Sequence, residues 1–162
     1  MDTEEFGVFI SHGGKSQVWK DVMIHLHKKF PDIGVYELSE QKNHGQTVIE
    51  KLNTAICENC DYAIVIMTKE DQTADGKWHP RPNVIHELGY CQGVLGRSNV
   101  LLLCERGVET FSNISGIVRE DFEGNNIKST FSVIDEHLEE VIELWEDDEL
   151  EYGDCDFEEE DE

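Results

Sequence analysis

Short apolar runs alternate along the chain with stretches in which apolar residues recur every three or four positions. Runs of this length predict β-strands, and the period of three to four residues predicts amphipathic helices. The expected strands cover residues 7–11, 34–38, 62–68 and 100–104, with a weaker signal for a fifth strand at 117–122. The expected helices cover residues 16–30, 47–56 and 83–95, and apolar residues between Phe131 and Trp145 outline a last helix.

This alternation predicts an α/β fold with a parallel five-stranded sheet and helices on both faces. The apolar run at 62–68 is continuous, as expected for a strand that is buried on both faces of such a sheet. Ligands of these sheets bind at the carboxyl ends of the strands. The loops after the first three strands, which begin at Ser11, Ser39 and Lys69, are therefore expected to lie on one rim and to enclose a pocket.

The segment from Arg81 to Cys91 combines a predicted helix start with a candidate reactive group. Pro82 suits the first turn of a helix, and Asn83 can cap it by accepting hydrogen bonds from backbone N–H groups. Glu87 lies beside the face that would enter the core, so its carboxylate can point into a cleft. The alternative interpretation is a surface glutamate, which composition alone favours. The residues of the buried face would be Val84, Leu88, Cys91 and Leu95.

The chain is strongly acidic, with 36 Asp and Glu residues against 13 Lys and Arg residues and a net charge of −23 at pH 7. Nearly half of the acidic residues follow Lys128, where there is no further Lys or Arg. Residues 146–162 hold too few apolar side chains to offset the entropy of ordering. We therefore predict a domain at 1–145 and a disordered acidic tail at 146–162. A charge of this sign argues against direct nucleic acid binding.

The five cysteines are an odd number and lie mostly in apolar surroundings, which favours reduced thiols over disulfides. Cys57 and Cys60 form a Cys-x-x-Cys pair at a predicted helix end, but a redox pair would open a helix and a zinc site would need further ligands. The apolar runs are too short to span a membrane, and the acidic start is unlike a signal peptide. We expect a cytoplasmic protein that uses no metal and contacts no membrane.

Two nucleotide-binding motifs are not supported by the spacing of the glycines. Gly14, Lys15 and Ser16 match the end of a P-loop, but Phe9 stands where that motif requires a glycine. The Gly-x-Gly-x-x-Gly pattern of hydride-transferring enzymes is also missing. Neither an ATPase nor a dehydrogenase is expected.

The order of several segments resembles the TIR-like domains of bacterial antiphage effectors. These NAD-cleaving domains are linked to cyclic-nucleotide signalling of the CBASS and Pycsar type and have a flavodoxin-like fold. The resemblance runs from about Gly7 to Ile134. The similar segments are the opening strand and loop at 8–13, the loop and helix at 40–51, the strand at 60–68, the Asn-Val-Ile-x-Glu-Leu-Gly helix at 83–89 and residues 114–117.

The resemblance implies cleavage of the bond between nicotinamide and ribose in NAD, with Glu87 as the catalytic residue. One carboxylate suffices, because nicotinamide departs as a neutral molecule and needs no general acid. Glu87 would hold the ribose hydroxyl groups and stabilise the developing oxocarbenium charge. NAD would be the substrate, and no cofactor is expected. Capture of the ribose by water would give ADP-ribose, and capture by the adenine would give a cyclic product.

The resemblance also implies a set of substrate-binding residues on the rim. Trp78 would stack on nicotinamide or adenine, or alternatively cover the edge of the sheet. Phe9 is alternatively a core residue. His86 departs from the family, which commonly has an aromatic residue before the glutamate. The implied set is Phe9, Ser11, His12, Gly13, Asn43, Trp78 and Asn83.

Members of this family commonly act as assemblies, in which a loop of one protomer completes the pocket of the next. The resemblance therefore implies a homo-oligomer formed through the Ser39–Gln46 loop. The family usually carries a fused cyclic-nucleotide sensor, which is not apparent in this sequence. Three explanations stay open: the chain is an effector domain cut from a longer protein, its sensor or activator is a separate partner protein, or the chain makes a nucleotide signal for such a sensor. Our prediction is an NAD glycohydrolase that is activated by self-assembly in bacterial antiphage defence.

Three other functions stay open at this point. A non-catalytic nucleotide-binding or scaffolding TIR module would self-associate through the same loop and would have no need of Glu87. A producer of a cyclic ADP-ribose-type signal would use Glu87 but release a different product. A nucleoside deoxyribosyltransferase also uses one glutamate at a glycosidic bond and would exchange bases on deoxynucleosides.

Overall fold

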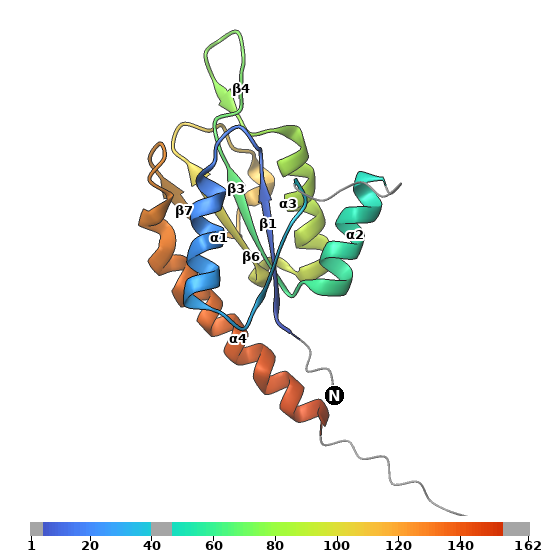
Figure 1. The fold of residues 1–162 in the computed structure, drawn as a ribbon. Helices are drawn as coiled ribbons and strands as arrows, with labels where there is room; N and C mark the ends of the chain where they lie inside the picture. Colours follow the sequence, from blue (N-terminus) through green and yellow to red (C-terminus); the bar gives the residue numbers. More distant parts are fainter. Residues whose placement is uncertain (1–4, 40–46, 154–162) are drawn as a thin grey trace, which may run out of the picture. The chain divides into compact units, whose positions relative to one another are not determined.

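A five-stranded parallel sheet forms the centre of the first unit of the chain, Met1–Phe131 (Figure 1). The computed structural model describes residues 5–39 and 47–153, and the structural statements below concern these residues. The strand order is β2-β1-β3-β6-β7, and each neighbouring pair is parallel. The strands are β1 Gly7–His12, β2 Gly34–Glu37, β3 Tyr62–Met67, β6 Val100–Glu105 and β7 Val118–Phe122. The predicted α/β fold with five parallel strands is therefore confirmed.

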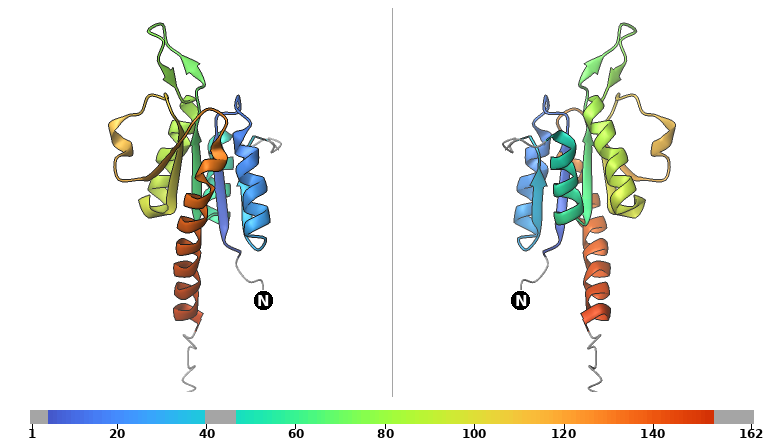
Figure 2. Two further views of the ribbon diagram at one scale, coloured as in Figure 1. Left: turned by 90° about the vertical axis from the view of Figure 1, so that its left-hand side faces the viewer. Right: turned by 90° about the vertical axis from the view of Figure 1, so that its right-hand side faces the viewer.

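Helices cover both faces of this sheet. Figure 2 shows α1 (Val18–Lys29) and α3 (Pro82–Leu95) on opposite faces. On the face of α3, side chains from α2 (Val48–Asn59) and α3 share one apolar cluster with alternate residues of the strands, including Phe9, Val65 and Leu102. All six residues of β3 are buried, as the continuous apolar run predicts. The core therefore lies on both sides of the central strands.

Three short 3-10 helices complete the first unit of the chain, Met1–Phe131. They are η1 Arg97–Asn99, η2 Ser112–Ile114 and η3 Ile127–Thr130. The second unit, Ser132–Glu162, contains nearly all of α4, which runs from Phe131 to Gly153. Within the described residues, no helix is both long and apolar enough to cross a membrane.

Helix α4 continues eight residues past Trp145, into the segment that we expected to be a tail without regular structure. Glu and Leu are good helix formers, and adding residues to an existing helix is far easier than nucleating one. The division into a domain at 1–145 and a tail at 146–162 stays a prediction, since residues 154–162 lie outside the described residues.

Two helix starts differ from those predicted. Helix α3 begins at Pro82 with Arg81 as its N-cap, so the predicted capping role of Asn83 is wrong. Proline takes the first helical position because its fixed φ suits the helix and the missing N–H has no partner there anyway. Helix α1 begins at Val18 with Gln17 as its N-cap, although the hydroxyl of Ser16 still accepts a hydrogen bond from the Val18 N–H at 3.4 Å.

The predicted polar loop at 69–81 contains a β-hairpin. Strands β4 (Asp71–Gln72) and β5 (Trp78–His79) pair in antiparallel fashion. The turn between them contains Gly76, whose φ of 83° is one that glycine adopts without strain. Two-residue strands are too short to show an alternating pattern, which is why the polar sequence indicated only a loop.

Helix α2 begins as predicted, because Thr47 and Glu50 form a capping box. The Thr47 hydroxyl accepts from the Glu50 N–H at 3.2 Å, and the Glu50 carboxylate accepts from the Thr47 N–H at 2.6 Å. Leu52 and Ile56 are buried, whereas Val48, which lies four residues before Leu52 on the same side of the helix, is 64% exposed. The first turn of α2 therefore extends beyond the core.

The buried position of the sheet can be tested with one substitution made at two sites. Ile64, in β3, is fully buried, whereas Ile24, in α1, is 66% exposed. We expect Ile64→Ala to lower the free energy of unfolding by about 2–5 kcal/mol, because it leaves a cavity in the core. Ile24→Ala should change it by no more than about 0.5 kcal/mol. Urea unfolding measures both, and equal losses would contradict the packing described here.

Candidate functional site

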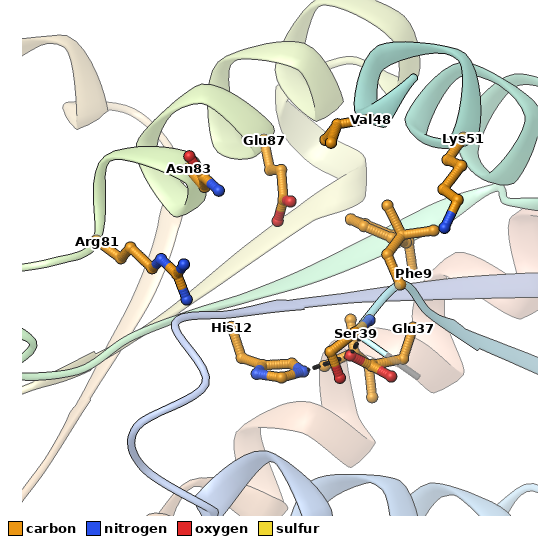
Figure 3. Close-up of a pocket in the computed structure, with 11 residues that line it drawn as sticks. Phe9, His12, Glu37, Ser39, Val48, Lys51, Arg81, Asn83 and Glu87 are labelled. Atoms are coloured by element: carbon orange, nitrogen blue, oxygen red, sulfur yellow. Dashed lines mark hydrogen bonds and ion pairs between the residues drawn. The ribbon is translucent and has the colours of Figure 1, made fainter. Parts of the chain in front are cut away.

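A pocket of about 200 Å³ opens at the carboxyl ends of β1 and β2, beside the N-terminal parts of α2 and α3 (Figure 3). This volume is smaller than that of a typical site for a whole drug-sized ligand. The rim thus brings together the ends of the strands, as expected for a parallel sheet. The lining residues are Phe9, Ile10, His12, Glu37, Leu38, Ser39, Val48, Lys51, Arg81, Asn83 and Glu87.

Glu87 projects into this pocket from the second turn of α3 (Figure 3). Its side chain is half-buried, and its Oε2 accepts a hydrogen bond from the Ser11 hydroxyl. Burial raises the pKa of Glu87, and the Ser11 hydrogen bond acts in the opposite direction. The predicted carboxylate is therefore neither fully solvated nor enclosed in the core.

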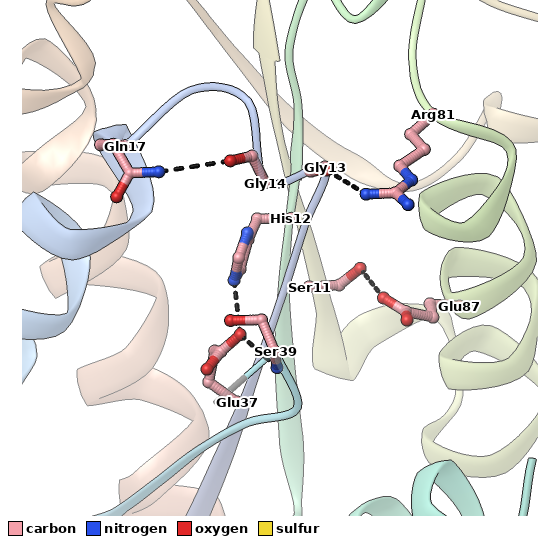
Figure 4. A network of polar contacts seen from close by, with 9 residues as sticks. All are labelled: Ser11, His12, Gly13, Gly14, Gln17, Glu37, Ser39, Arg81 and Glu87. Carbon is pink, nitrogen blue, oxygen red and sulfur yellow. Dashed lines mark hydrogen bonds and ion pairs between the residues drawn. The ribbon is translucent and has the colours of Figure 1, made fainter. Parts of the chain in front are cut away.

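Ser11 connects the first strand to the third helix. It is 1% exposed at the end of β1, and it contacts a residue 76 positions away in the chain (Figure 4). A buried hydroxyl needs a hydrogen-bond partner, and Glu87 supplies it. Ser11 is therefore a partner of the candidate catalytic carboxylate and is not itself a lining residue.

A second carboxylate, Glu37, lies on another wall of the same pocket. One of its oxygens, Oε1, lies 2.6 Å from Nε2 of His12 and accepts the backbone N–H of Ser39, also at 2.6 Å (Figure 4). Burial would raise the pKa of Glu37, but the hydrogen bonds from Ser39 and His12 outweigh it and lower the pKa. Glu37 is thus held as a carboxylate.

Two cationic side chains also line the pocket. Lys51 is 7% exposed on α2, and Arg81 precedes α3 and donates from Nη1 to the carbonyl oxygen of Gly13 at 2.9 Å. Lysine and arginine are the usual partners of phosphate groups. The pocket therefore combines carboxylates that suit ribose hydroxyl groups with cations that suit a diphosphate.

Three of the predicted site residues, Phe9, His12 and Asn83, line the pocket, and Phe9 also belongs to the core cluster. Their contact with a substrate stays a prediction. A Cβ atom at Gly13 would lie 2.3 Å from Oε1 of the buried Glu70, so a larger residue there would require the Glu70 side chain to move.

Trp78 is not among the lining residues, so the structure does not bring it to the pocket. It lies in β5, where its carbonyl oxygen accepts the Glu109 N–H at 2.7 Å and its backbone forms a bridge with Val108. Trp78 thus belongs to a hairpin, which the polar sequence of the segment did not indicate. Asn43 lies outside the described residues.

Sequence reasoning missed Glu37, Lys51 and Arg81. The rule that ligands bind at strand ends could have identified Glu37, the last residue of β2. Lys51 directly follows the capping-box residue Glu50 in the first turn of α2, and this place near a helix start could have marked it as a candidate. Arg81 carried no signal of its own, because its contact with Gly13 depends on how the hairpin enters α3.

None of the four cysteines among the described residues lines the pocket. Cys60, Cys91 and Cys104 are buried free thiols, and burial raises the pKa of Cys91 to about 12 and that of Cys104 to about 11. These thiols are therefore protonated and unreactive near neutral pH. Among the described residues, no group of three or more His, Cys, Asp or Glu side chains could hold a metal ion.

Comparison with known proteins identifies relatives of this fold and site. The sequence model for the TIR domain of CAP12/Pycsar effector proteins matches residues 7–124. Protein tirC of Dictyostelium discoideum is 40% identical over 112 residues, which cover 63% of this chain and 54% of that protein. The uncharacterized protein YuaY of Escherichia coli K12 is 33% identical over 118 residues, covering 68% of this chain and 38% of that protein. The match thus spans about half or less of each relative.

The Ser11 hydrogen bond should control the protonation of Glu87. Because this bond stabilises the carboxylate, we expect Ser11→Ala to raise the pKa of Glu87 above its wild-type value. NMR titration of the Glu87 carboxyl group measures the change. Ser115 is an exposed serine directly after η2, so Ser115→Ala is the control. It should leave the pKa of Glu87 unchanged. A pKa in Ser11→Ala equal to or below that of the wild type would contradict the contact.

Proposed function

The chain belongs to the family of CAP12/Pycsar effector TIR domains, and we propose that it is an NAD glycohydrolase that cleaves the bond between nicotinamide and ribose. One observation carries this proposal. Glu87 is half-buried in a pocket at the carboxyl rim of the sheet, and Ser11 donates a hydrogen bond to its carboxylate. A scaffold would have no need of a partly desolvated carboxylate in a cleft.

The chemistry follows from the charge of the substrate. The nicotinamide ring of NAD is a pyridinium, so it leaves with the electron pair of the glycosidic bond and becomes neutral. Positive charge then develops on the ribose, and the Glu87 carboxylate stabilises it in the pocket, where water is partly excluded. Water adds to the ribose carbon and loses a proton, which gives ADP-ribose.

Lys51 and Arg81 support a dinucleotide as the substrate class. Both line the same pocket as Glu87, and both can bind the diphosphate that joins the two halves of NAD. The volume of about 200 Å³ suits one half of the dinucleotide, with the other half outside the pocket. No metal or cofactor has a part in the proposed reaction.

We further propose that self-assembly through the Ser39–Gln46 loop activates the enzyme. Residues 40–46 lie outside the described residues, but the chain directly after them supports this proposal. Val48 and Ile49 are 64% and 57% exposed at the start of α2, beside the pocket. Adjacent exposed apolar side chains are typical of surfaces that bind another protein.

The relatives are longer than the matched region, so the activity and partners of whole proteins are proposals for this chain. We propose that a separate cyclic-nucleotide sensor or activator triggers assembly in antiphage defence. The proposed place of action is the cytoplasm, where NAD is available. Mass analysis of the reaction products distinguishes hydrolysis from formation of a cyclic ADP-ribose.

Replacement of Glu87 tests the catalytic role directly. Glu87→Gln keeps the size of the side chain and can still accept the Ser11 hydrogen bond, but it removes the charge. We expect nicotinamide release from NAD under crowding to fall by at least about a hundredfold. Glu58→Gln, the same change at an exposed position of α2, should leave the rate unchanged. Equal release by Glu87→Gln and the wild type would defeat the proposal.

The pH dependence of the reaction provides a second test. Glu87 must be ionised to stabilise positive charge, and burial raises its pKa above the ordinary value of 4.5. We therefore expect kcat/KM to rise with pH through this raised pKa, so that the acidic limb lies above pH 4.5. The limb should move further upward in Ser11→Ala. A downward move in that variant would be inconsistent with Glu87 as the titrating group.

A further inference from the structure

We propose that Glu37 is a positioning residue, which holds the end of β1 and the segment after β2 in the arrangement that binds the substrate. This inference rests on the proposed function, because the substrate is taken to be NAD. It assigns to Glu37 a role in shaping the pocket, distinct from the chemical role of Glu87. The evidence for this role is the set of contacts made by one oxygen of the Glu37 carboxylate.

Oε1 of Glu37 connects two separate segments of the pocket wall. His12 ends β1 and places its Nε2 2.6 Å from this oxygen, whereas Ser39 follows β2 and donates its backbone N–H at 2.6 Å. His12, Glu37 and Ser39 all line the pocket. Removal of this one oxygen would therefore release both segments at once.

The pair between His12 and Glu37 is shielded from water. The side chains of both residues are only 6% exposed, so the contact is strengthened by the low dielectric around it. A contact at the surface would contribute little to holding the wall, since water would compete for both partners. Because it is buried, the contact between His12 and Glu37 holds this part of the pocket wall in place.

Trp19 holds the imidazole of His12 in place. The two rings stack with a centroid distance of 4.1 Å and an angle of 8° between their planes. Trp19 is 5% exposed, and its indole N–H has no hydrogen-bond partner among the described residues. Packing, and not hydrogen bonding, therefore sets the position of this tryptophan, and the ring supports His12 from α1.

Glu37 lies across the pocket from the candidate catalytic group. Figure 3 shows Glu87, Asn83 and Arg81 on one side and His12, Glu37 and Ser39 on the other. Loss of the Glu37 contacts would thus displace the wall opposite Glu87 and leave the Ser11 hydrogen bond in place. The expected consequence is weaker binding of the substrate with little change in the chemical step.

A pair of variants separates the hydrogen bonds of Glu37 from its charge. Glu37→Ala and Glu37→Gln both remove the charge, but only glutamine keeps an oxygen that can accept from Ser39 and His12. We expect Glu37→Ala to raise the KM for NAD by about tenfold with kcat changed less than about threefold, as for loss of a hydrogen bond to a charged group. Glu37→Gln should restore KM to within about threefold of the wild type.

Two outcomes of these kinetics would overturn the proposal. One is a KM in Glu37→Ala that equals that of the wild type. The other is a fall in kcat as large as the fall in kcat/KM, which would place Glu37 in the chemical step. Urea unfolding of each variant shows whether the protein is folded under the assay conditions.

Hydrogen exchange at the Ser39 amide tests the same contact without NAD. We expect this amide to be protected in the wild-type protein, to exchange at least about tenfold faster in Glu37→Ala and to recover protection in Glu37→Gln. Exchange of the Ser39 amide at the same rate in all three proteins would overturn the proposal. This test applies even if Glu37→Ala is too unstable for kinetic assays. If the wild type does not cleave NAD, the proposed function fails, but the exchange rates still decide whether Glu37 holds Ser39.

Discussion

The burial of the central strands constrains the rest of this structure. Every residue of β3 is buried, and in β1 and β6 only the last residue is partly exposed. Buried backbone N–H and C=O groups must be paired, so these strands hydrogen-bond along their length and leave no space for polar side chains until they end. Polar groups therefore collect at the carboxyl rim, where Ser11 and His12 are the last two residues of β1 and Glu37 ends β2. The burial of the central strands therefore determines where the site lies.

Two carboxylates share the pocket, but their surroundings differ. Burial raises the pKa of Glu87, and only a hydroxyl group donates to it within the described hydrogen bonds, so its charge is incompletely compensated. Burial acts to raise the pKa of Glu37, but hydrogen bonds from the side chain and backbone of Ser39 and from His12 outweigh it, so the pKa is lowered. Environments that displace two pKa values in opposite directions suit two different tasks. In the proposals made above, the incompletely compensated carboxylate responds to a cationic substrate, whereas the one that contacts His12 and Ser39 holds the wall.

The membership in the CAP12/Pycsar effector TIR family and the arrangement of the pocket support each other. The family match covers residues 7–124, which include every residue that lines the pocket. Fold alone does not determine function, because one fold carries many sites. The reaction proposed here therefore depends on the contacts of Glu87, and the positioning role depends on those of Glu37.

Local pattern in the sequence determined the α/β fold, the five strands, the start of α2 directly after Thr47 and the candidacy of Glu87. These features depend on periodicity and on neighbours within one helical turn, which are visible in the chain itself. Tertiary structure alone decided that Ser11 meets Glu87 across 76 positions, that His12 meets Glu37 and that Trp78 lies in a hairpin away from the pocket. The physical reason is that such contacts depend on strand order and on side-chain direction at the rim, and neither is encoded in the spacing of residues along the chain.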